Sequence, residues 1–216
     1  MSYLHIDSIQ KSFGQNVVLN SIFLQCYSGE IIALLGRNGS GKSTLLKIIF
    51  GSLYTEKRYV KINNFVIQGL SENRNQLVYL PQHTFFPAHT RIKTLARLLL
   101  NKEAERKFSA LSKPYFSTNK RVNELSGGER RIAELLLLIL SSAKYILLDE
   151  PFNGLAPLQK EFIKSLILEE SRQKGFIITD HDYRNILDIS QRLVFLKDGR
   201  LSPIKADELQ DYGYLP

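Results

Sequence analysis

A glycine-rich turn between an apolar run and a helical pattern constrains the fold of this chain more than any other feature. The run IIALLG, residues 31–36, has no polar alternation, which is typical of a strand covered on both faces of a mostly parallel sheet. The turn GRNGSGKST follows at residues 36–44, and STLLKIIFG then has helical spacing and ends at Gly51. A strand, a turn of the form G-x-x-x-x-G-K-[ST] and a helix, in this order, predict an α/β fold with a phosphate-binding loop.

The residue types in this turn suit a nucleotide. Glycines let backbone N–H groups converge on phosphate oxygens, and the helix that follows adds positive potential at its N-terminus. Lys42 offers a point charge to the β- and γ-phosphates, and Ser43 offers a hydroxyl to Mg²⁺. The predicted nucleotide-binding residues are Gly36, Asn38, Gly39, Ser40, Gly41, Lys42, Ser43 and Thr44.

A second apolar strand ends in two acidic residues. The segment YILLDEP places Asp149 and Glu150 at this end. Asp149 suits the Mg²⁺ shell, and Glu150 suits a general base that polarises an attacking water. Adjacent acids at the end of an apolar strand are costly without a cation nearby, and Mg²⁺ and Lys42 would supply one. The alternative is a solvated strand end.

The third motif is LSGGE, residues 125–129, which precedes a helical pattern. Ser126 suits the N-cap of that helix, so a plain capping turn is one interpretation. The other interpretation is contact with a γ-phosphate, because two glycines after the cap expose their backbone N–H groups to an anion.

Charge and composition limit the class of protein. The 216 residues carry a net charge of +8, and nine Lys and Arg against two acids between Arg91 and Arg121 account for +7 of it. Such a segment is a solvated helix face, a contact surface for a partner or membrane, or a nucleic-acid site. One cysteine excludes a disulfide framework, and the longest apolar run, residues 135–140, is too short to span a membrane. The N-terminus has no secretory leader, so we expect a cytoplasmic protein.

Strands alternate with helices along the chain, which predicts an α/β core. A helical, basic segment interrupts this core as an inserted subdomain. The expected elements are antiparallel strands in the first forty residues, strands at 58–68 and 77–82, helices at 90–120 (with a break at Pro114) and 129–140, a strand at 145–151, a helix at 157–174, a strand at 175–181 and a hairpin at 192–201.

Four motifs in this order resemble the nucleotide-binding subunit of an ABC transporter: GRNGSGKST, LSGGE, ILLDEP and the histidine of TDHD. The resemblance covers about residues 4–201. It implies a P-loop NTPase core, with a mostly parallel sheet flanked by helices, an N-terminal antiparallel β subdomain and a short helical insert. One domain would span residues 1–216, with its core at 1–82 and 141–216 and its helical subdomain at about 83–140.

The resemblance also implies ATP and Mg²⁺ as ligands, and ATP hydrolysis that powers transport through a separate membrane-spanning component. The partners would be an integral membrane permease and a second ATPase subunit, either a copy of this chain or a paralogue, with no nucleic acid. The place would be the cytoplasmic face of the inner or plasma membrane. A soluble ATPase of the same type, acting in iron–sulfur cofactor assembly, is the alternative.

Further site residues follow from the resemblance alone. Phe13, in KSFG, would stack on adenine, unless it is a core residue. Gln82 would touch Mg²⁺ or the attacking water, and His181 would contact the γ-phosphate, at the strand end where parallel sheets place ligands. With Glu150, these last two complete the implied catalytic set. The implied Mg²⁺ ligands are Ser43, Gln82 and Asp149.

The family works as a head-to-tail pair, so LSGGE would act on the nucleotide of the other subunit. Ser126, Gly127, Gly128 and Glu129 of one copy would close on the ATP held by Lys42 of the other.

Three departures from the family pattern affect these expectations. Ala156 stands where the loop after the acidic pair commonly carries an Asp, so communication between the two sites through this loop is open. Leu137 replaces an arginine often found in the helix after LSGGE, and we expect a partner to cover an exposed side of this leucine-rich helix. The insert is short, with 44 positions from Gln82 to Ser126. The phrases EPFNGLAP and ITDHDYRNIL resemble the ATPases of lipopolysaccharide export.

Overall fold

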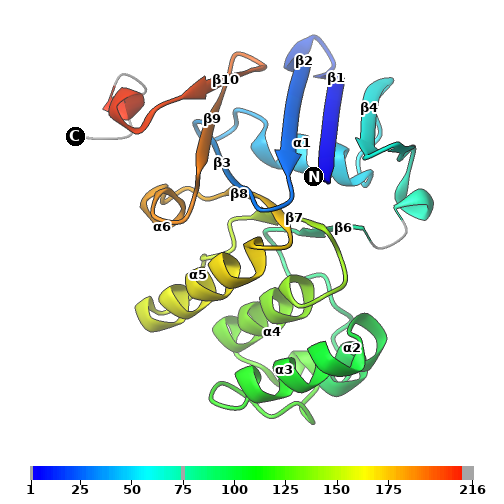
Figure 1. Cartoon of the computed structure of the whole chain (residues 1–216), viewed down its shortest axis with the longest axis vertical. Coiled ribbons are helices and arrows are strands. Elements are labelled where there is room, and N and C mark those ends of the chain that lie inside the picture. The colour runs from blue at the N-terminus through cyan, green and yellow to red at the C-terminus, as the bar shows by residue number, and fades with distance from the viewer. Residues whose placement is uncertain (1, 74–75, 211–216) are drawn as a thin grey trace.

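Two β-sheets organise the described part of the chain, which comprises residues 2–73 and 76–210 of the computed structural model (Figure 1). The larger sheet consists of β3 (Ile31–Leu35), β6 (Leu77–Leu80), β7 (Tyr145–Asp149), β8 (Gly175–Thr179), β9 (Arg192–Lys197) and β10 (Arg200–Ile204). The smaller sheet consists of β1 (Tyr3–Phe13), β2 (Asn16–Tyr27), β4 (Lys57–Ile62) and β5 (Phe65–Val66). The strand orders are β10-β9-β3-β8-β7-β6 and β2-β1-β4-β5.

The larger sheet is parallel except for its edge strand β10, and the smaller sheet is antiparallel, as predicted. Every residue of β3, β7 and β8 is buried. This confirms the interpretation of the apolar runs at residues 31–36 and 145–151 as buried strands. Along β3, Ile31 and Leu35 belong to one hydrophobic cluster, whereas Ile32 and Leu34 belong to another. Apolar side chains therefore cover both faces of the larger sheet.

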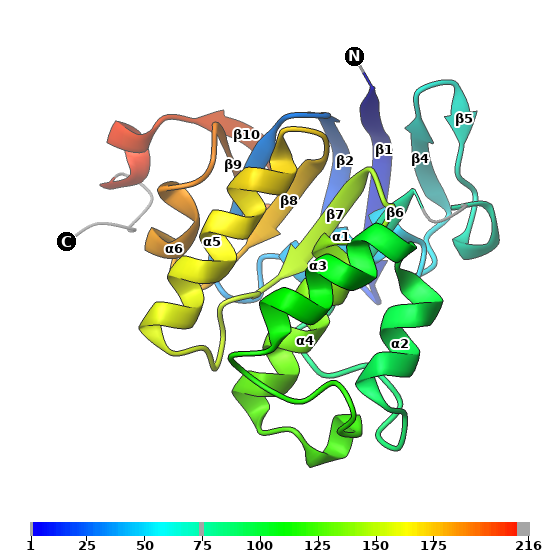
Figure 2. The ribbon, with the colours of Figure 1, turned by 60° about the horizontal axis from the view of Figure 1, so that its bottom comes forward.

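The larger sheet separates these two clusters, and helices pack against both of its faces. The helix α1 (Lys42–Phe50) shares its cluster with the inner face of the smaller sheet, so α1 lies between the two sheets. The helices α4 (Gly127–Ile139) and α5 (Pro157–Ser171) cover the other face, across β7 and β8 (Figure 2). The described residues also form a short helix, α6 (Arg184–Leu187), and three 3-10 turns. These turns are Leu70–Glu72, Val122–Glu124 and Ala206–Gln210.

The carboxyl ends of parallel strands meet at one edge of a sheet, where α/β proteins bind ligands. Four predicted site segments follow four such ends: the glycine-rich turn after β3, Gln82 after β6, Glu150 after β7 and His181 after β8. The topology thus brings segments that are between 31 residues (Glu150 to His181) and 145 residues (Gly36 to His181) apart in the chain to the same edge of the larger sheet.

The insert contains α2 (Ile92–Leu99) and α3 (Lys102–Ser112), at the end of the molecule away from β1, β2 and β10 (Figure 1). The prediction of a helix unbroken as far as Pro114 is wrong. The helix stops at Leu100, and Asn101 caps α3 by accepting a hydrogen bond from the backbone N–H of Ala104 at 2.9 Å. The division of the chain at residues 83 and 140 stays a prediction.

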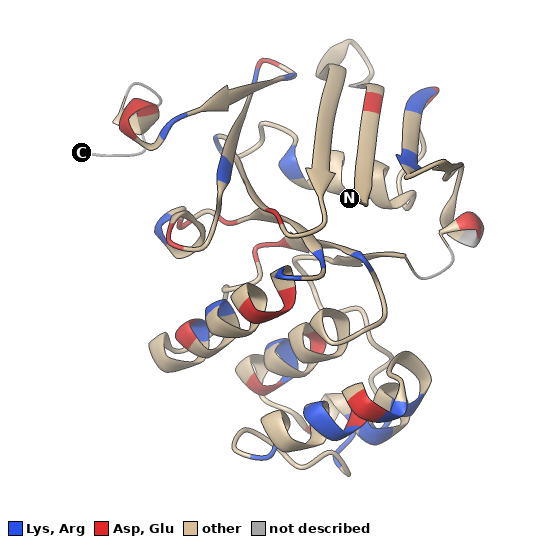
Figure 3. Cartoon of the chain, viewed as in Figure 1, with Lys and Arg blue, Asp and Glu red and all other residues tan. Residues whose placement is uncertain are grey.

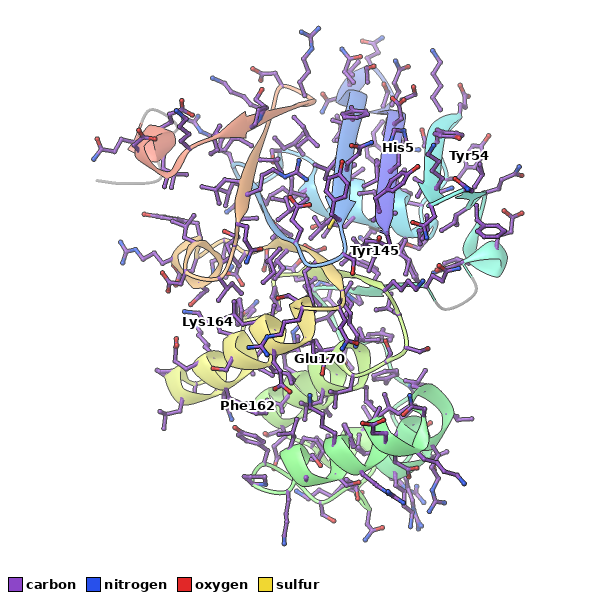
Figure 4. The ribbon with its side chains drawn as sticks, viewed as in Figure 1. His5, Tyr54, Tyr145, Phe162, Lys164 and Glu170 are labelled. Carbon is purple, nitrogen blue, oxygen red and sulfur yellow. The ribbon has the colours of Figure 1, made fainter. Side chains whose placement is uncertain are left out.

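Aromatic and ionic contacts join the insert to α5. The rings of Tyr115 and Phe162 have centroids 5.3 Å apart. The ammonium of Lys107 donates to Glu169 at 2.8 Å and to Glu170 at 2.7 Å. Figure 4 shows Phe162 and Glu170 on the side of α5 toward the insert. The positive charge of Lys107 is therefore neutralised within the chain.

The expected exposed side of the leucine-rich helix α4 is absent. Leu135 to Leu140 are at most 6% exposed, and Leu137 is fully buried. The helix α4 contacts α2, α3, α5 and β6, so elements of this chain cover the leucines on every side. The expectation of a partner covering this helix is wrong because α2 and α3 fold over it. Within residues 2–73 and 76–210, no helix has the length and hydrophobicity of a membrane span.

Candidate nucleotide-binding and hydrolytic site

The turn between β3 and α1 requires its glycines. A Cβ on Gly36 would lie 2.6 Å from Ser40 Oγ and 2.8 Å from the carbonyl oxygen of Leu196. A Cβ on Gly41 would lie 2.7 Å from Val18 Cγ1, and Gly41 has a φ of +105°. The helix α1 starts directly after Gly41, and no side chain caps it. Its first N–H groups and its dipole are thus available to an anion held in the turn.

Lys42 lies at the centre of this turn. Its ammonium donates to the carbonyl oxygens of Gly36 at 2.6 Å and Arg37 at 3.1 Å. Burial lowers the pKa of Lys42, and the negative charges of Glu150 and Asp149 oppose that shift. The ammonium is placed where phosphate oxygens would replace the carbonyls as its partners.

Asp149 connects the turn to β7. The hydroxyl of Ser43 donates to Asp149 Oδ1 at 3.0 Å, and the hydroxyl of Tyr79 donates to Asp149 Oδ2 at 2.9 Å. Asp149 is 1% exposed. Burial raises the pKa of Asp149, and the two hydrogen bonds oppose the shift. Sequence reasoning missed Tyr79, whose only signal was a polar tip in an otherwise apolar strand.

The arrangement of oxygen ligands suits Mg²⁺ bound together with a nucleotide. Ser43 and Asp149 present a hydroxyl and a carboxylate, which are hard ligands of the kind that Mg²⁺ prefers. In the part of the chain that the structure describes, no three His, Cys, Asp or Glu side chains form a metal-binding group. Most of the coordination shell would therefore come from phosphate oxygens and water, as is usual for this ion.

Three side chains from three strand ends meet at Glu150. Gln82 Nε2 donates to Glu150 Oε2 at 2.7 Å, and His181 Nδ1 lies 3.5 Å from the same oxygen. Glu150 has a φ of +49°, an uncommon conformation for a residue with a side chain. Next to His181, Asp180 is buried and accepts a hydrogen bond from the backbone N–H of Asp182 at 3.0 Å. Burial raises the pKa of Asp180. Asp180 was not identified as a site residue from the sequence.

A cleft of about 620 Å³ contains most of the predicted nucleotide site. This volume is in the range of small-molecule pockets. The ring of Phe13 is 52% exposed at its margin, which excludes the core interpretation of this residue. The predicted residues that line the cleft are Phe13, Asn38, Gly39, Gly41, Lys42, Ser43, Thr44, Gln82, Glu150 and His181.

The LSGGE segment does not line this cleft. Ser126 caps α4 by accepting from the backbone N–H of Glu129 at 3.3 Å, and Glu129 accepts from the N–H of Ser126 at 2.7 Å. This reciprocal capping box lowers the pKa of Glu129. Ser126 and Gly127 remain exposed, and Gly128 packs near the carbonyl oxygen of Gly154. Both interpretations of the motif are compatible, because the cap leaves the first residues of α4 accessible.

Comparisons with known proteins agree with this geometry. The family profile described as "ABC transporter" matches residues 19–153, more than half of the chain. A curated protein of Acidithiobacillus ferridurans, "Lipopolysaccharide export system ATP-binding protein LptB", is 32% identical over 92% of this chain and 88% of its own length. The protein of the same name in Haemophilus influenzae is 31% identical over 93% and 89%.

A solved structure gives the same fold. "Structure of ATP binding subunit of ABC transporter" has a TM-score of 0.86, with 23% identity, and the match covers 98% of this chain and 93% of the solved one. The predicted family and fold are thus confirmed. The chain belongs to the ABC transporter family and is one of its ATP-binding, ATP-hydrolysing subunits.

Proposed function

We propose that the chain binds ATP with Mg²⁺ in the cleft beside Lys42 and hydrolyses it with Glu150 as general base. The observation that carries this proposal is the convergence of Gln82 and His181 on one oxygen of Glu150, at the edge of the phosphate-binding turn. A carboxylate with both an amide and an imidazole beside it is placed to accept a proton from a water next to the γ-phosphate.

Each neighbour of Glu150 has a separate part in this proposal. Gln82 holds the carboxylate and orients the water, and His181 contacts the γ-phosphate. Lys42 balances negative charge on the β- and γ-phosphates. Bound Mg²⁺, held by Ser43 and Asp149, would neutralise charge on the phosphate oxygens. The half-exposed ring of Phe13 would stack on the adenine.

We further propose that two ATPase subunits pair head to tail. The support is that the LSGGE segment and the cleft, which would act on the same nucleotide, lie apart within one chain. Ser126 and Gly127 are exposed and lie outside the cleft that Lys42 and Glu150 line. The first turn of α4 would reach the γ-phosphate only from a second subunit. The pair is a homodimer or includes a paralogue.

The proposed permease partner and the cytoplasmic membrane face draw support from the charge of the insert. Lys102 and Arg106 on α3 and Lys113 directly after it are exposed, and their spacing of four and seven residues puts them on one side, opposite the buried Phe108 and Ser112. Figure 3 shows Lys and Arg gathered along α3. Arg91 and Arg121 face each other across a short antiparallel bridge. Cations gathered in this way favour the anionic surface of a bilayer over solvent.

Glu150→Gln tests the proposed base. The variant keeps the volume of the side chain and its bond to Gln82, so we expect ATP binding to persist, phosphate release to stop and an ATP-bound dimer to accumulate. Phosphate release is measured by a coupled assay and dimer mass by light scattering. Glu56→Gln, an exposed residue before β4, is the matched control. Wild-type phosphate release by the Glu150 variant would refute the assignment.

The membrane partner is tested separately, by affinity purification from detergent-solubilised membranes. Recovery of a polytopic protein supports transport, and recovery of soluble scaffold proteins alone favours iron–sulfur cofactor assembly. Replacing Lys102, Arg106 and Lys113 together with Gln should reduce sedimentation with phosphatidylglycerol vesicles. If sedimentation is unchanged, the charge serves only solvation.

A further inference from the structure

A buried arginine on α4 binds the backbone of two catalytic loops at once. Arg131 is 7% exposed. Its guanidinium donates to the carbonyl oxygens of Pro81 at 2.8 Å, Asp149 at 2.9 Å, Glu150 at 2.8 Å and Pro151 at 3.2 Å. Pro81 immediately precedes Gln82, and the other three carbonyls surround the proposed base. The planar fork of one side chain therefore spans the ends of β6 and β7.

Glu134, one turn further along α4, completes this arrangement. Its Oε2 lies 3.4 Å from Arg131 Nη1, and Glu134 is 1% exposed. Burial raises the pKa of Glu134, and the charge of Arg131 opposes that shift. Arg131, paired with Glu134, thus holds the loop that carries Gln82 by the carbonyl oxygen of the residue before it.

These contacts bear on the backbone of Glu150 as well. A residue other than glycine with a φ near +49° is retained only where its surroundings over-determine it. Arg131 bonds the carbonyl oxygens on both sides of this residue and its own. The direction in which the Glu150 carboxylate points is consequently set in part from α4.

The helix that carries Arg131, α4, begins at the exposed residues Ser126 and Gly127 of LSGGE. The helix α4 is a continuous element of 13 residues, and its leucine-rich part is buried on every side. Such an element moves as a rigid body. A displacement of Ser126 is therefore passed to Arg131 and from there to the loops of Gln82 and Glu150.

We propose that Arg131, braced by Glu134, is a positioning residue for ATP hydrolysis that ties the LSGGE helix to the backbone of Gln82 and Glu150. This inference rests on the proposed role of Glu150. Arg131 makes no contact with the nucleotide in this proposal. Replacing Arg131 should therefore lower the rate of ATP turnover and leave the affinity for ATP unchanged.

Arg131→Lys is the primary test, because it keeps the buried charge and removes the fork. We expect kcat to fall about 10- to 100-fold, since a misplacement near 1 Å of catalytic groups costs up to about 100-fold. We expect the Kd for MANT-ATP to stay within about twofold. Glu134→Gln, which keeps the shape and removes the charge of the brace, should lower kcat in the same direction and serves if Arg131→Lys does not fold.

Arg58→Lys is the matched structural control. Arg58 also binds four backbone carbonyls, but none of them belongs to a residue that lines the cleft. They are those of Ile48 and Ile49, near the end of α1, and of Ile67 and Gln68, directly after β5. We expect both lysine variants to lower Tm and only Arg131→Lys to lower kcat of the folded protein. Equal kcat in the two variants would overturn the proposal.

A double-mutant cycle with Gln82→Ala tests the route of action. If Arg131 acts through Gln82, the combined loss of kcat is smaller than the product of the single losses. Independent, multiplicative losses would contradict the proposal. Glu150→Gln distinguishes the two levels: if that variant is inactive and Arg131→Lys turns over like the wild type, only the role of Arg131 fails. If Glu150→Gln stays active, the proposed function fails.

Discussion

Removing the hydroxyl of Tyr79 measures how much its hydrogen bond stabilises the buried, ionised Asp149. Tyr79→Phe removes one of the two hydrogen bonds to a carboxylate that is 1% exposed, and it leaves the ring volume unchanged. Hydrogen bonds to charged groups contribute about 1.5–3 kcal/mol. We expect the free energy of unfolding to fall by this amount near neutral pH, which for a chain of this size lowers Tm by about 3–12 °C.

The pH dependence of this loss has a defined sign. Burial raises the pKa of Asp149, so protonation of Asp149 stabilises the fold as pH falls through its folded-state pKa. The bond from Tyr79 lowers that pKa, so its contribution is full while Asp149 is ionised. After protonation the pair makes a neutral hydrogen bond of about half the strength. The difference between wild type and Tyr79→Phe should therefore shrink on acidification.

Urea unfolding followed by far-UV circular dichroism, at about pH 7.5 and about pH 5, measures both effects. Tyr59→Phe is the control, because Tyr59 is 40% exposed on the smaller sheet. Equal stability of Tyr79→Phe and wild type near neutral pH would refute the reasoning. A deficit that grows on acidification would refute the sign of the linkage.

Three further substitutions have defined outcomes. Lys42→Ala should abolish ATP binding, because the charge that meets the phosphates is lost; saturable MANT-ATP binding at wild-type affinity would contradict this. Phe13→Ala should weaken MANT-ATP binding by about 1–3 kcal/mol without changing Tm, since a half-exposed ring contributes stacking and little core packing. Gly175→Ala should lower stability by about 1–3 kcal/mol in urea unfolding, because its Cβ would lie 2.7 Å from Tyr145 Cδ1 and 2.8 Å from the carbonyl oxygen of Tyr27. Unchanged unfolding would show that β7 and β8 relax around the methyl group.

Local patterns predicted the parts of the fold that depend on neighbours in the chain. The apolar runs of β3 and β7 predicted buried strands, because both faces of such strands lie under helices or another sheet. The hairpin of β9 and β10 was predicted from Asp198-Gly199, and both residues have the positive φ that such a turn requires.

Contacts between distant segments could not be predicted in this way. The leucines of α4 looked exposed because α2 and α3, which cover them, lie 20–50 residues earlier in the chain. Lys107 was one of the nine cations counted in residues 91–121, and its partners Glu169 and Glu170 follow about 60 residues later, outside that segment. The same holds for the site: the motifs marked Lys42 and Glu150, but not Tyr79, whose partner lies 70 residues away.

The burial of α4 has a consequence for the timescale on which the molecule opens. Amide protons exchange with solvent through local opening at exposed loops and only through global unfolding in fully packed elements. The backbone N–H groups of residues 135–140 should therefore be among the last to exchange with deuterium, whereas those of residues 82–84, in an exposed loop, should exchange early. Local opening of the loop around Gln82 then leaves α4 folded, and the loop closes again onto the same buried helix.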